Sequence, residues 1–554
     1  MGAFIAPIFM TMANYSSDFL PMRDFQQPGR SPVYGTNGAA ATSHPLATLT
    51  AIEVLKSGGN AVDAAIAASA VLCVVEPQAT GIGGDCFALY APAGTGTVVG
   101  LNGSGRAPAA ATVDWFLDQG ITTIDRHSPH AVTIPGAVDA WSQWVEDYGR
   151  KTLGELLQPA IHYAQAGYPV YPRVAFDWTR ERKTLRTCAE STRIFLPDGK
   201  APTPGSIHRQ PELAQTLEAI AHNGRDAFYR GEVAEKIVHF LNDLGGLHTL
   251  EDFAATVGDY VTPISTSYRG YEVLECPPNG QGITALIMLN ILEGLERSSD
   301  DPLSVERFHL LCEASRLAYL ERDRYVADPD FSSLPIDELL SKQHAATLRE
   351  YIRRDRAMTD LPAPLFPTHP DTVYLCVVDS DGNAMSFINS VFHPFGSGLM
   401  APGTGVMLQS RGSGFRVDPS HFNCIGPSKR PLHTIIPGIL LQGTGSNRRA
   451  VMPFGVMGGE FQPAGQVHLL TNMLDYGMDV QAALDFPRVF HLLNTCRVER
   501  GIPEAIALGL ADLSHKVQPT PTPHGGGQAI WIDHQSGLFM AGSDPRKDGC
   551  ALAY

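Results

Sequence analysis

The chain has 554 residues, which is enough to bury a large core or to form several folding units. Hydrophobic residues make up 44% of it and charged residues 18%, so a mostly disordered chain is excluded. The formal net charge of −16 would repel a phosphate backbone or an anionic lipid surface. We therefore expect no nucleic acid and no membrane among its partners.

The cysteines and the N-terminus limit the kind of protein further. Nine cysteines, an odd number, are scattered from Cys73 to Cys550 without a CxxC pair, which predicts neither structural zinc nor a disulfide framework. The His, Asp and Glu residues show no clustered ligand spacing, so we expect no catalytic metal and no cofactor. The N-terminus lacks the basic start of a secretory signal, which indicates a cytoplasmic location. The apolar run 61–75 is too short to span a bilayer.

Helical patterns dominate the first two thirds of the chain. The segment that starts at Pro45 predicts two helices, broken at Gly58-Gly59, with Asn60 as the N-cap of the second. Two short strands bounded by glycines follow, within 80–92 and 95–108. Later helices are expected at 152–166, 211–223, 232–244 and 304–324.

The pattern changes after segment 356–371, which has four prolines and no periodicity and predicts an exposed connection. A strand, a turn at 379–383 and a second strand come next. If this turn is centred near Asp381, Thr372 faces Ser390 across the hairpin within a residue or two. A helical region over 466–486 and another hairpin over 524–549 complete the pattern, which favours a layered α/β sandwich over a Rossmann sheet.

Several common chemistries have no motif in the sequence. It contains no Walker A sequence, no HExxH and no GxSxG, and the glycine runs at 81–85 and 103–108 are typical of tight turns. A chain cut before Thr372 would begin with a threonine that carries both a nucleophilic hydroxyl and a basic α-amine. On spacing alone, an ordinary threonine at the start of a strand is the simpler interpretation.

A series of longer motifs changes this interpretation. The segment 44–85, HPDTVYLCVVDSDGNAMSF from His369, segment 391–415, KRPLHTIIP, VMGGE and GSDPRKDG occur in that order. Together they resemble the gamma-glutamyltransferase family of N-terminal-nucleophile hydrolases, over most of the chain. The resemblance implies an α+β fold with a four-layer αββα sandwich, made as one precursor that cuts itself into a large and a small chain.

The resemblance also assigns regions and reacting groups. It implies an N-terminal extension at 1–43, a large chain at 44–371 and a small chain at 372–554. Cleavage would fall between Asp371 and Thr372, and Thr372 would be the nucleophile. Ser390 matches a second hydroxyl that hydrogen-bonds the nucleophile, and Gly458 and Gly459 match the glycine pair of the oxyanion hole, although a simple turn also explains this pair.

The substrate pocket departs from the family pattern. Ser104 stands where related transferases carry an arginine for the substrate's α-carboxylate, and Arg106 lies two residues further along. The segment 409–415 has lost the acidic residue that binds the α-amino group and has gained Arg411. A pocket without carboxylates has no partner for a substrate ammonium, whereas an arginine suits a carboxylate. A surface arginine in a salt bridge is the alternative interpretation of Arg411.

Two further departures point the same way. A serine pair of the family is replaced by His433-Thr434, and an asparagine near the second hydroxyl is replaced by Phe392. The variant motifs resemble the branch that contains oxamate amidohydrolase. We therefore expect an N-terminal-threonine amidohydrolase that releases ammonia from a small anionic amide such as oxamate, with Arg411 or Arg106 holding the carboxylate.

Alternatives stay open. A γ-glutamyl hydrolase or transferase acting on glutathione-like donors is the first, and a cephalosporin-acylase-like activity is more distant. An uncleaved, inactive relative that serves as a binding protein is an alternative of a different class. The expected partners are a small amide substrate and the two chains of one precursor, with a homo-oligomer of such heterodimers possible.

Overall fold

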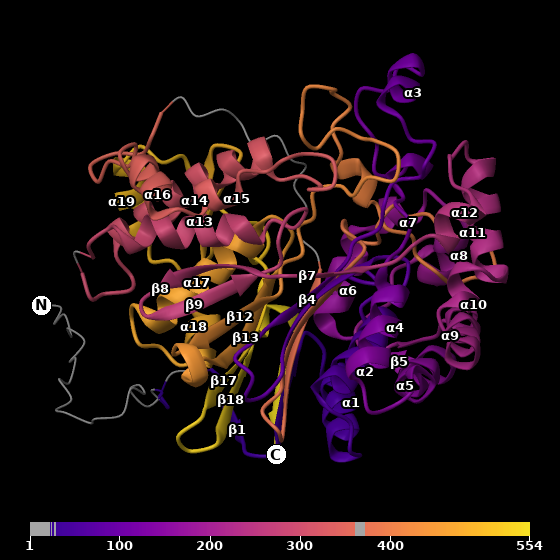
Figure 1. Ribbon diagram of the computed structural model, residues 1–554, viewed down its shortest axis with the longest axis horizontal. Helices are drawn as coiled ribbons and strands as arrows, with labels where there is room; N and C mark the ends of the chain where they lie inside the picture. Colours follow the sequence, from indigo (N-terminus) through magenta and orange to yellow (C-terminus); the bar gives the residue numbers. More distant parts are fainter. Residues whose placement is uncertain (1–22, 24, 27–28, 298, 360–371) are drawn as a thin grey trace, which may run out of the picture.

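Two large β-sheets lie face to face at the centre of the molecule, with helices on both outer sides (Figure 1). The computed structural model describes residues 23, 25–26, 29–297, 299–359 and 372–554. Helices from the first half of the chain cover one outer face, and helices from the middle and the end cover the other (Figure 1). The predicted αββα sandwich is confirmed.

Each sheet has seven strands and combines segments from both sides of residue 371. In order, the first sheet contains β1 (Val33–Gly35), β18 (Leu538–Ser543), β17 (Gly526–Asp533), β13 (Arg449–Met457), β12 (Gly438–Gln442), β9 (Tyr271–Glu275) and β8 (Ile264–Tyr268). The second contains β19 (Cys550–Ala553), β2 (Gly38–Thr42), β10 (Val373–Asp379), β11 (Ala384–Ser390), β3 (Asp85–Ala91), β4 (Val99–Gly103) and β7 (Asp259–Val261). All neighbours in both sheets are antiparallel.

The side chains of β10 explain how the layers are held together. Successive residues of a strand point to opposite faces, and both faces of β10 are apolar. Tyr374 and Cys376 join the core between the two sheets, whereas Val373 and Leu375 join the core beneath the helices. A strand that is buried on both faces in this way needs a layer on each side.

Helices α1 (Pro45–Lys56) and α2 (Ala61–Val75) form the layer next to β10, and α2 packs directly on it. The predicted N-cap is confirmed: the Asn60 side chain accepts a hydrogen bond from the Asp63 backbone N–H, and the Asp63 carboxylate accepts one from the Asn60 N–H. The other helices of this side are α4 (Ala137–Tyr148), α5 (Leu153–Ala166), α6 (Pro172–Arg180), α9 (Pro211–Asn223) and α11 (Glu232–Asp243).

The opposite layer is built mainly from α13 (Gly282–Glu293), α14 (Val305–Tyr325) and α17 (Phe461–Leu474). These helices share an apolar core with β13 and β17. Beside them lie α18 (Val480–Asp485), α19 (Glu504–Asp512) and a small sheet of β14 (Val489–Leu492), β15 (Thr495–Val498) and β16 (Val517–Pro519). Within the described residues, no helix is both long and apolar enough to cross a membrane.

The structure corrects several expectations. The expected N-terminal extension at 1–43 contains β1 and β2, so its last residues belong to the two sheets. The helical region expected at 466–486 begins earlier, at Phe461, because Pro463 lies in the first turn, where no intrahelical N–H is needed. It is also interrupted around Gly477, where φ is 66°. The small sheet was not predicted at all.

Candidate active site

Thr372 and Ser390 end the two strands of the β10–β11 hairpin and face each other. Val373 pairs with Asn389, so the register brings the next two residues together as predicted. Their hydroxyl oxygens are 3.2 Å apart, and both residues are fully buried. Asp371, the other residue of the predicted cleavage site, lies outside the described residues.

The direction of this hydrogen bond follows from the other partners of Ser390. Its Oγ accepts from the Phe392 backbone N–H at 3.0 Å and from Arg411 Nη2 at 3.4 Å. A hydroxyl has two acceptor positions and one proton, so the remaining proton of Ser390 is directed to Thr372 Oγ1. A hydrogen bond in this direction can stabilise negative charge on the Thr372 oxygen.

Arg411 lies at the start of a short 3-10 helix (Arg411–Gly414) and is fully buried. Besides Ser390, it donates from Nη1 to Thr434 Oγ1 at 2.9 Å, and its guanidinium stands 4.1 Å above the ring centroid of Phe392. Its Nε has no hydrogen-bond partner, and no carboxylate of the described residues forms an ion pair with it. Burial lowers the pKa of Arg411 to about 9, partly opposed by the charge of Asp85.

His433 and Asp85 form a second buried pair beside Arg411. His433 Nε2 lies 3.1 Å from Asp85 Oδ2, while Nδ1 accepts from the Ile435 N–H at 3.3 Å. Burial, followed by the charge of Arg411, lowers the pKa of His433 to about 3, so the ring is neutral and Nε2 carries the proton. Asp85 Oδ1 accepts three further bonds, from the Gly105 N–H, the Gly136 N–H and Gln409 Nε2.

Gln281 connects Thr434, which accepts a hydrogen bond from Arg411, with the glycine pair Gly458 and Gly459. Its Nε2 donates to the Thr434 carbonyl at 2.8 Å and to the Gly459 carbonyl at 3.1 Å. Gly458 and Gly459 have φ values of 125° and 58°, and a methyl group at Gly458 would lie 2.7 Å from Gly525 Cα. Both positions therefore require glycine, and the pair turns the chain from β13 into α17.

The structure places Ser104 and Arg106 in different environments. Ser104 is buried, and its Oγ accepts from Asn279 Nδ2 at 3.1 Å. Arg106 is partly exposed and already has three carboxylates near its guanidinium, at 3.3 to 3.7 Å: Asp259, Asp328 and Asp330. Its charge is thus neutralised within the protein, unlike that of Arg411.

Two groups of this region are not among the predicted site residues, although one of them, Glu460, ends the VMGGE motif. Glu460 directly follows the glycine pair, is 3% exposed, and has no hydrogen-bond partner for either carboxyl oxygen within the described residues. Gln281 is the N-cap residue of α13 and lies far from Thr434 and Gly459 in the sequence. Only the fold brings these residues together.

The structure also contains a cluster of possible metal ligands, which the spacing of the His, Asp and Glu residues in the sequence did not predict. His309, Glu313 and His515 bring ligand atoms within 4.8 Å of one another. However, His309 Nδ1 and His515 Nε2 already share a hydrogen bond of 2.7 Å. Both carboxyl oxygens of Glu313 also have partners, in Arg316 and the Met358 N–H. These contacts occupy most of the ligand atoms of the cluster, and of these atoms His515 Nδ1 alone lacks a partner within the described residues.

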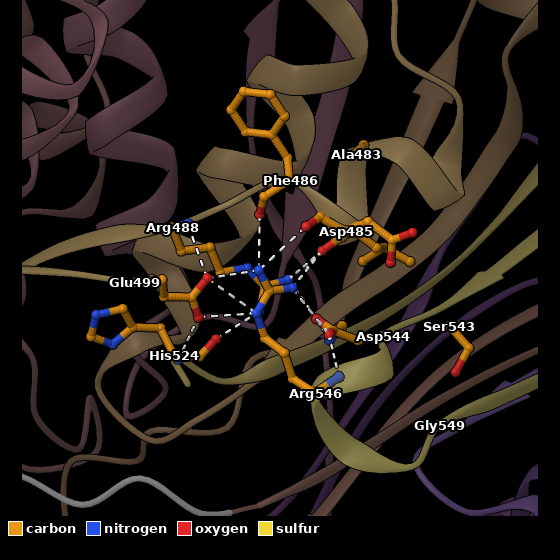
Figure 2. Close-up of polar contacts among 12 residues, drawn as sticks. Ala483, Asp485, Phe486, Arg488, Glu499, His524, Ser543, Asp544, Arg546 and Gly549 are labelled. Carbon is orange, nitrogen blue, oxygen red and sulfur yellow. Dashed lines mark hydrogen bonds and ion pairs between the residues drawn. The ribbon is translucent and has the colours of Figure 1, made fainter. Parts of the chain in front are cut away.

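The GSDPRKDG motif forms a buried ion-pair cluster near the C-terminus (Figure 2). Arg546 pairs with Glu499 at 2.7 Å and with Asp544 at 3.2 Å, and Asp544 also pairs with Arg488 at 2.6 Å. Arg546 Nη2 donates to the Phe486 carbonyl as well. Each charge has a partner, so this motif stabilises the junction between the small sheet and the end of β18.

Comparison with known proteins agrees with this architecture. The family model described as gamma-glutamyltranspeptidase matches residues 47–554. The chain belongs to the gamma-glutamyltranspeptidase family. Membership in this family, together with the N-terminal-nucleophile hydrolase fold, makes it an amide hydrolase.

Individual relatives carry different names. The chain is 39% identical to the glutathione hydrolase-like YwrD proenzyme of Bacillus subtilis (strain 168), over 94% of this chain and 99% of the relative. It is 32% identical to the oxamate amidohydrolase proenzyme of Klebsiella pneumoniae, again over 94% of this chain and 99% of that one. A crystal structure of cephalosporin acylase from Bacillus halodurans is 40% identical, with a TM-score of 0.89 and coverage of 97% and 99%.

Proposed function

We propose that this protein cuts itself between Asp371 and Thr372 and then uses Thr372 to hydrolyse a small anionic amide such as oxamate. The observation that carries the proposal is the buried group of Thr372, Ser390 and Arg411, in which one serine hydroxyl contacts both a potential nucleophile and a cation without a carboxylate partner in the described structure. The word proenzyme in the names of the relatives supports self-cleavage.

The reaction follows from the positions of these groups. After cleavage, the α-amine of Thr372 takes the proton of its own hydroxyl, and the oxygen attacks the amide carbon. Ser390 donates a hydrogen bond to this oxygen, and the N–H groups of Gly458 and Gly459 stabilise the negative charge that develops on the substrate oxygen. The C–N bond of this tetrahedral intermediate then breaks, and ammonia leaves with the proton that the α-amine took. Water hydrolyses the resulting ester, which gives the free acid and restores the Thr372 hydroxyl.

Arg411 gives the site its preference for an anionic substrate. A carboxylate next to the scissile carbonyl would supply the partner that this buried guanidinium lacks among the described residues, and a planar carboxylate can accept two parallel hydrogen bonds from it. His433 contributes by remaining neutral, so that it does not add a second cation. Arg106 is not needed for this role, because it has three carboxylates of its own.

Glutathione-like donors are the second candidate, because a relative named glutathione hydrolase-like is 39% identical. Such donors carry an ammonium group that needs a carboxylate. Asp85 is unsuited to this task, since four hydrogen bonds already occupy its two oxygens. Glu460 is a carboxyl next to the glycine pair that has no such partners within the part of the chain that the structure describes.

The decisive experiment measures processing and substrate choice on one preparation. Mass spectrometry should show a small chain that begins at Thr372. Ammonia release from oxamate should then exceed aniline release from a γ-glutamyl anilide by a wide margin in kcat/KM. The reverse order would favour the second candidate, and a small chain with a different first residue would exclude Thr372 as the nucleophile. The cytoplasmic location is also a proposal, which cell fractionation can test.

A further inference from the structure

Phe392 has a backbone conformation that is rare for a large side chain. It lies two residues after Ser390, where β11 ends, and its φ is 79°. This left-handed region suits glycine, whereas a bulky residue there is strained and persists only where its surroundings hold it. Such outliers cluster at functional sites, and Phe392 contacts two residues of this one, Ser390 and Arg411.

The backbone of Phe392 contacts the hydroxyl that lies beside the proposed nucleophile. Its N–H donates to Ser390 Oγ at 3.0 Å, in a turn where a serine hydroxyl accepts from the backbone two residues later. This bond takes one of the two acceptor positions of Ser390, and Arg411 Nη2 at 3.4 Å takes the other. The serine proton is left for Thr372 Oγ1, 3.2 Å away. The turn at Phe392 therefore helps to set the direction of the hydrogen bond between Ser390 and Thr372.

The ring of Phe392 contacts the buried cation. The Arg411 guanidinium stands 4.1 Å from the ring centroid, and both side chains are fully buried, which is the setting in which a cation–π contact is strongest. The ring also belongs to the apolar core that β13 shares with α13 and α17, so packing fixes its position. The ring offsets part of the cost of burying the cation, but it supplies no negative charge. It gives one face of the guanidinium a fixed surface on which to rest.

Hydrogen bonds on both sides of Phe392 hold its segment against that of Arg411. The Ser410 N–H donates to the Val391 carbonyl at 3.2 Å. Two residues further along, His393 Nδ1 lies 2.9 Å from Ser410 Oγ. The residues before and after Phe392 are thus both bonded to the residue before Arg411. This arrangement keeps the ring and the guanidinium together, and it opposes relaxation of Phe392 to a negative φ.

We propose that Phe392 is a positioning residue that fixes Ser390 and Arg411 relative to each other. This inference rests on the proposed function, in which Arg411 holds the substrate's carboxylate and Ser390 supports the nucleophile. In oxamate the carboxylate and the scissile carbonyl are bonded directly to each other, so the place of the cation decides whether Thr372 can reach the carbonyl carbon. A guanidinium that could move away from Phe392 would bind the carboxylate in unproductive positions as well.

The first test separates the ring from the backbone. Phe392→Leu keeps a large apolar side chain and the constraint on the backbone, but it removes the aromatic face. We expect it to raise KM for oxamate ~10-fold, the scale of a desolvated cation–π contact, with a smaller effect on kcat. Phe392→Gly also lacks the ring, and its backbone can leave the left-handed turn without cost. It should raise KM similarly and lower kcat ~5-fold or more, because the hydrogen bond to Ser390 is no longer held.

Oxamide provides a readout that a purely structural role would not move. It has nearly the size and shape of oxamate but carries a neutral amide in place of the carboxylate. Phe392→Leu should raise KM for oxamate ~10-fold and KM for oxamide about 2-fold or less, because charge-assisted hydrogen bonds are the stronger ones. An equal rise for both amides would overturn the role of the ring. Equal kcat values for Phe392→Leu and Phe392→Gly would overturn the role of the backbone.

Phe395→Leu is the matched control. Phe395 lies in the same segment, is also fully buried and has a φ of 55°, but its ring packs on Trp178 and Phe195. It should leave the ratio of the two KM values as in the wild type. Every preparation must show the large and the small chain on a denaturing gel. If Phe392→Leu does not fold, Phe392→Met takes its place, because a flexible methionine fills irregular space in a core.

A double-mutant cycle tests the ring contact without any substrate. Phe392→Leu, Arg411→Met and the double variant are compared by denaturant unfolding in the Thr372→Ala chain, which should stay uncleaved and therefore unfold as one chain. Phe392→Leu should raise the unfolding constant ~10-fold more in the presence of Arg411 than in its absence. Equal effects in the two backgrounds would overturn the contact between the ring and the cation.

The proposed function can fail separately. If the wild-type protein hydrolyses γ-glutamyl amides but no oxamate, the anionic-amide proposal is wrong, while the cycle and the comparison of kcat between Phe392→Leu and Phe392→Gly still decide on Phe392. If it hydrolyses neither kind of amide, the proposed function is overturned, and the cycle decides on the ring contact. If it hydrolyses oxamate and the Phe392 variants change neither KM nor kcat, only the role of Phe392 is overturned.

Discussion

Replacing Arg411 with Met should stabilise the folded protein and at the same time remove most of its activity toward an anionic amide. The guanidinium is fully buried, and the fall of its pKa from 12.5 to about 9 corresponds to roughly 5 kcal/mol of unfavourable charge burial. Met fills a similar volume without the charge. The hydrogen bonds to Thr434 and Ser390 are lost, which costs about 2 kcal/mol. The net gain should be about 3 kcal/mol, within the range for replacing buried charges by apolar groups.

The assay compares the denaturant midpoints of processed wild-type protein and the variant at one protein concentration, because the two chains can dissociate. In the same samples, KM for oxamate should rise ~100-fold or more, since about 3 kcal/mol of charge-assisted hydrogen bonding is lost. Arg411→Lys keeps the charge without the planar geometry and should show a smaller rise in KM and little gain in stability. A lower midpoint for Arg411→Met would refute the view that this cation lacks a partner in the folded protein.

Other predictions concern the reacting hydroxyls and the response to acid. Thr372→Ala should abolish both self-cleavage and turnover, whereas Thr372→Ser should keep part of each; a cleaved, active Thr372→Ala would contradict the mechanism. Ser390→Ala should lower kcat by about 10-fold while cleavage persists on a denaturing gel, because one supporting hydrogen bond is lost. Below pH 6.5 the protein should lose stability, since burial lowers the pKa values of His44 and His433 to about 3 and of His524 to about 4, and the unfolded chain binds protons that the folded chain does not. Each of these histidines should contribute about 1.4 kcal/mol per pH unit between pH 6 and 4.5, and equal denaturant midpoints at pH 7 and pH 5 would contradict this.

The hairpin that contains Thr372 could be predicted because its geometry is local. The period of two along each strand and the position of the turn fix which residues face each other, so counting from Asp381 is sufficient to pair Thr372 with Ser390. The helices could be predicted for the same reason, since periodicity and caps such as Asn60 are also local signals.

The difference between Arg411 and Arg106 could not be predicted, because it depends on distant segments. Both stand in motifs that depart from the family pattern. Only the fold brings Asp259 and Asp328 to Arg106, from more than 150 positions away, and leaves Arg411 without such a group in the described structure. The small sheet was missed because its strands are three or four residues long, too short for a periodic pattern.

Arg411 and Glu460 show two ways in which a buried ionisable group is tolerated in a folded chain. The cation of Arg411 is unfavourable in the free protein, where no carboxylate of the described residues forms an ion pair with it, and in the proposed function the carboxylate of the substrate supplies that partner. Glu460 avoids the corresponding cost, because burial raises its pKa to about 8 and it is mostly a neutral acid at pH 7. The charge of Arg411 therefore becomes favourable when an anionic amide is bound, whereas the protonated Glu460 needs no such partner.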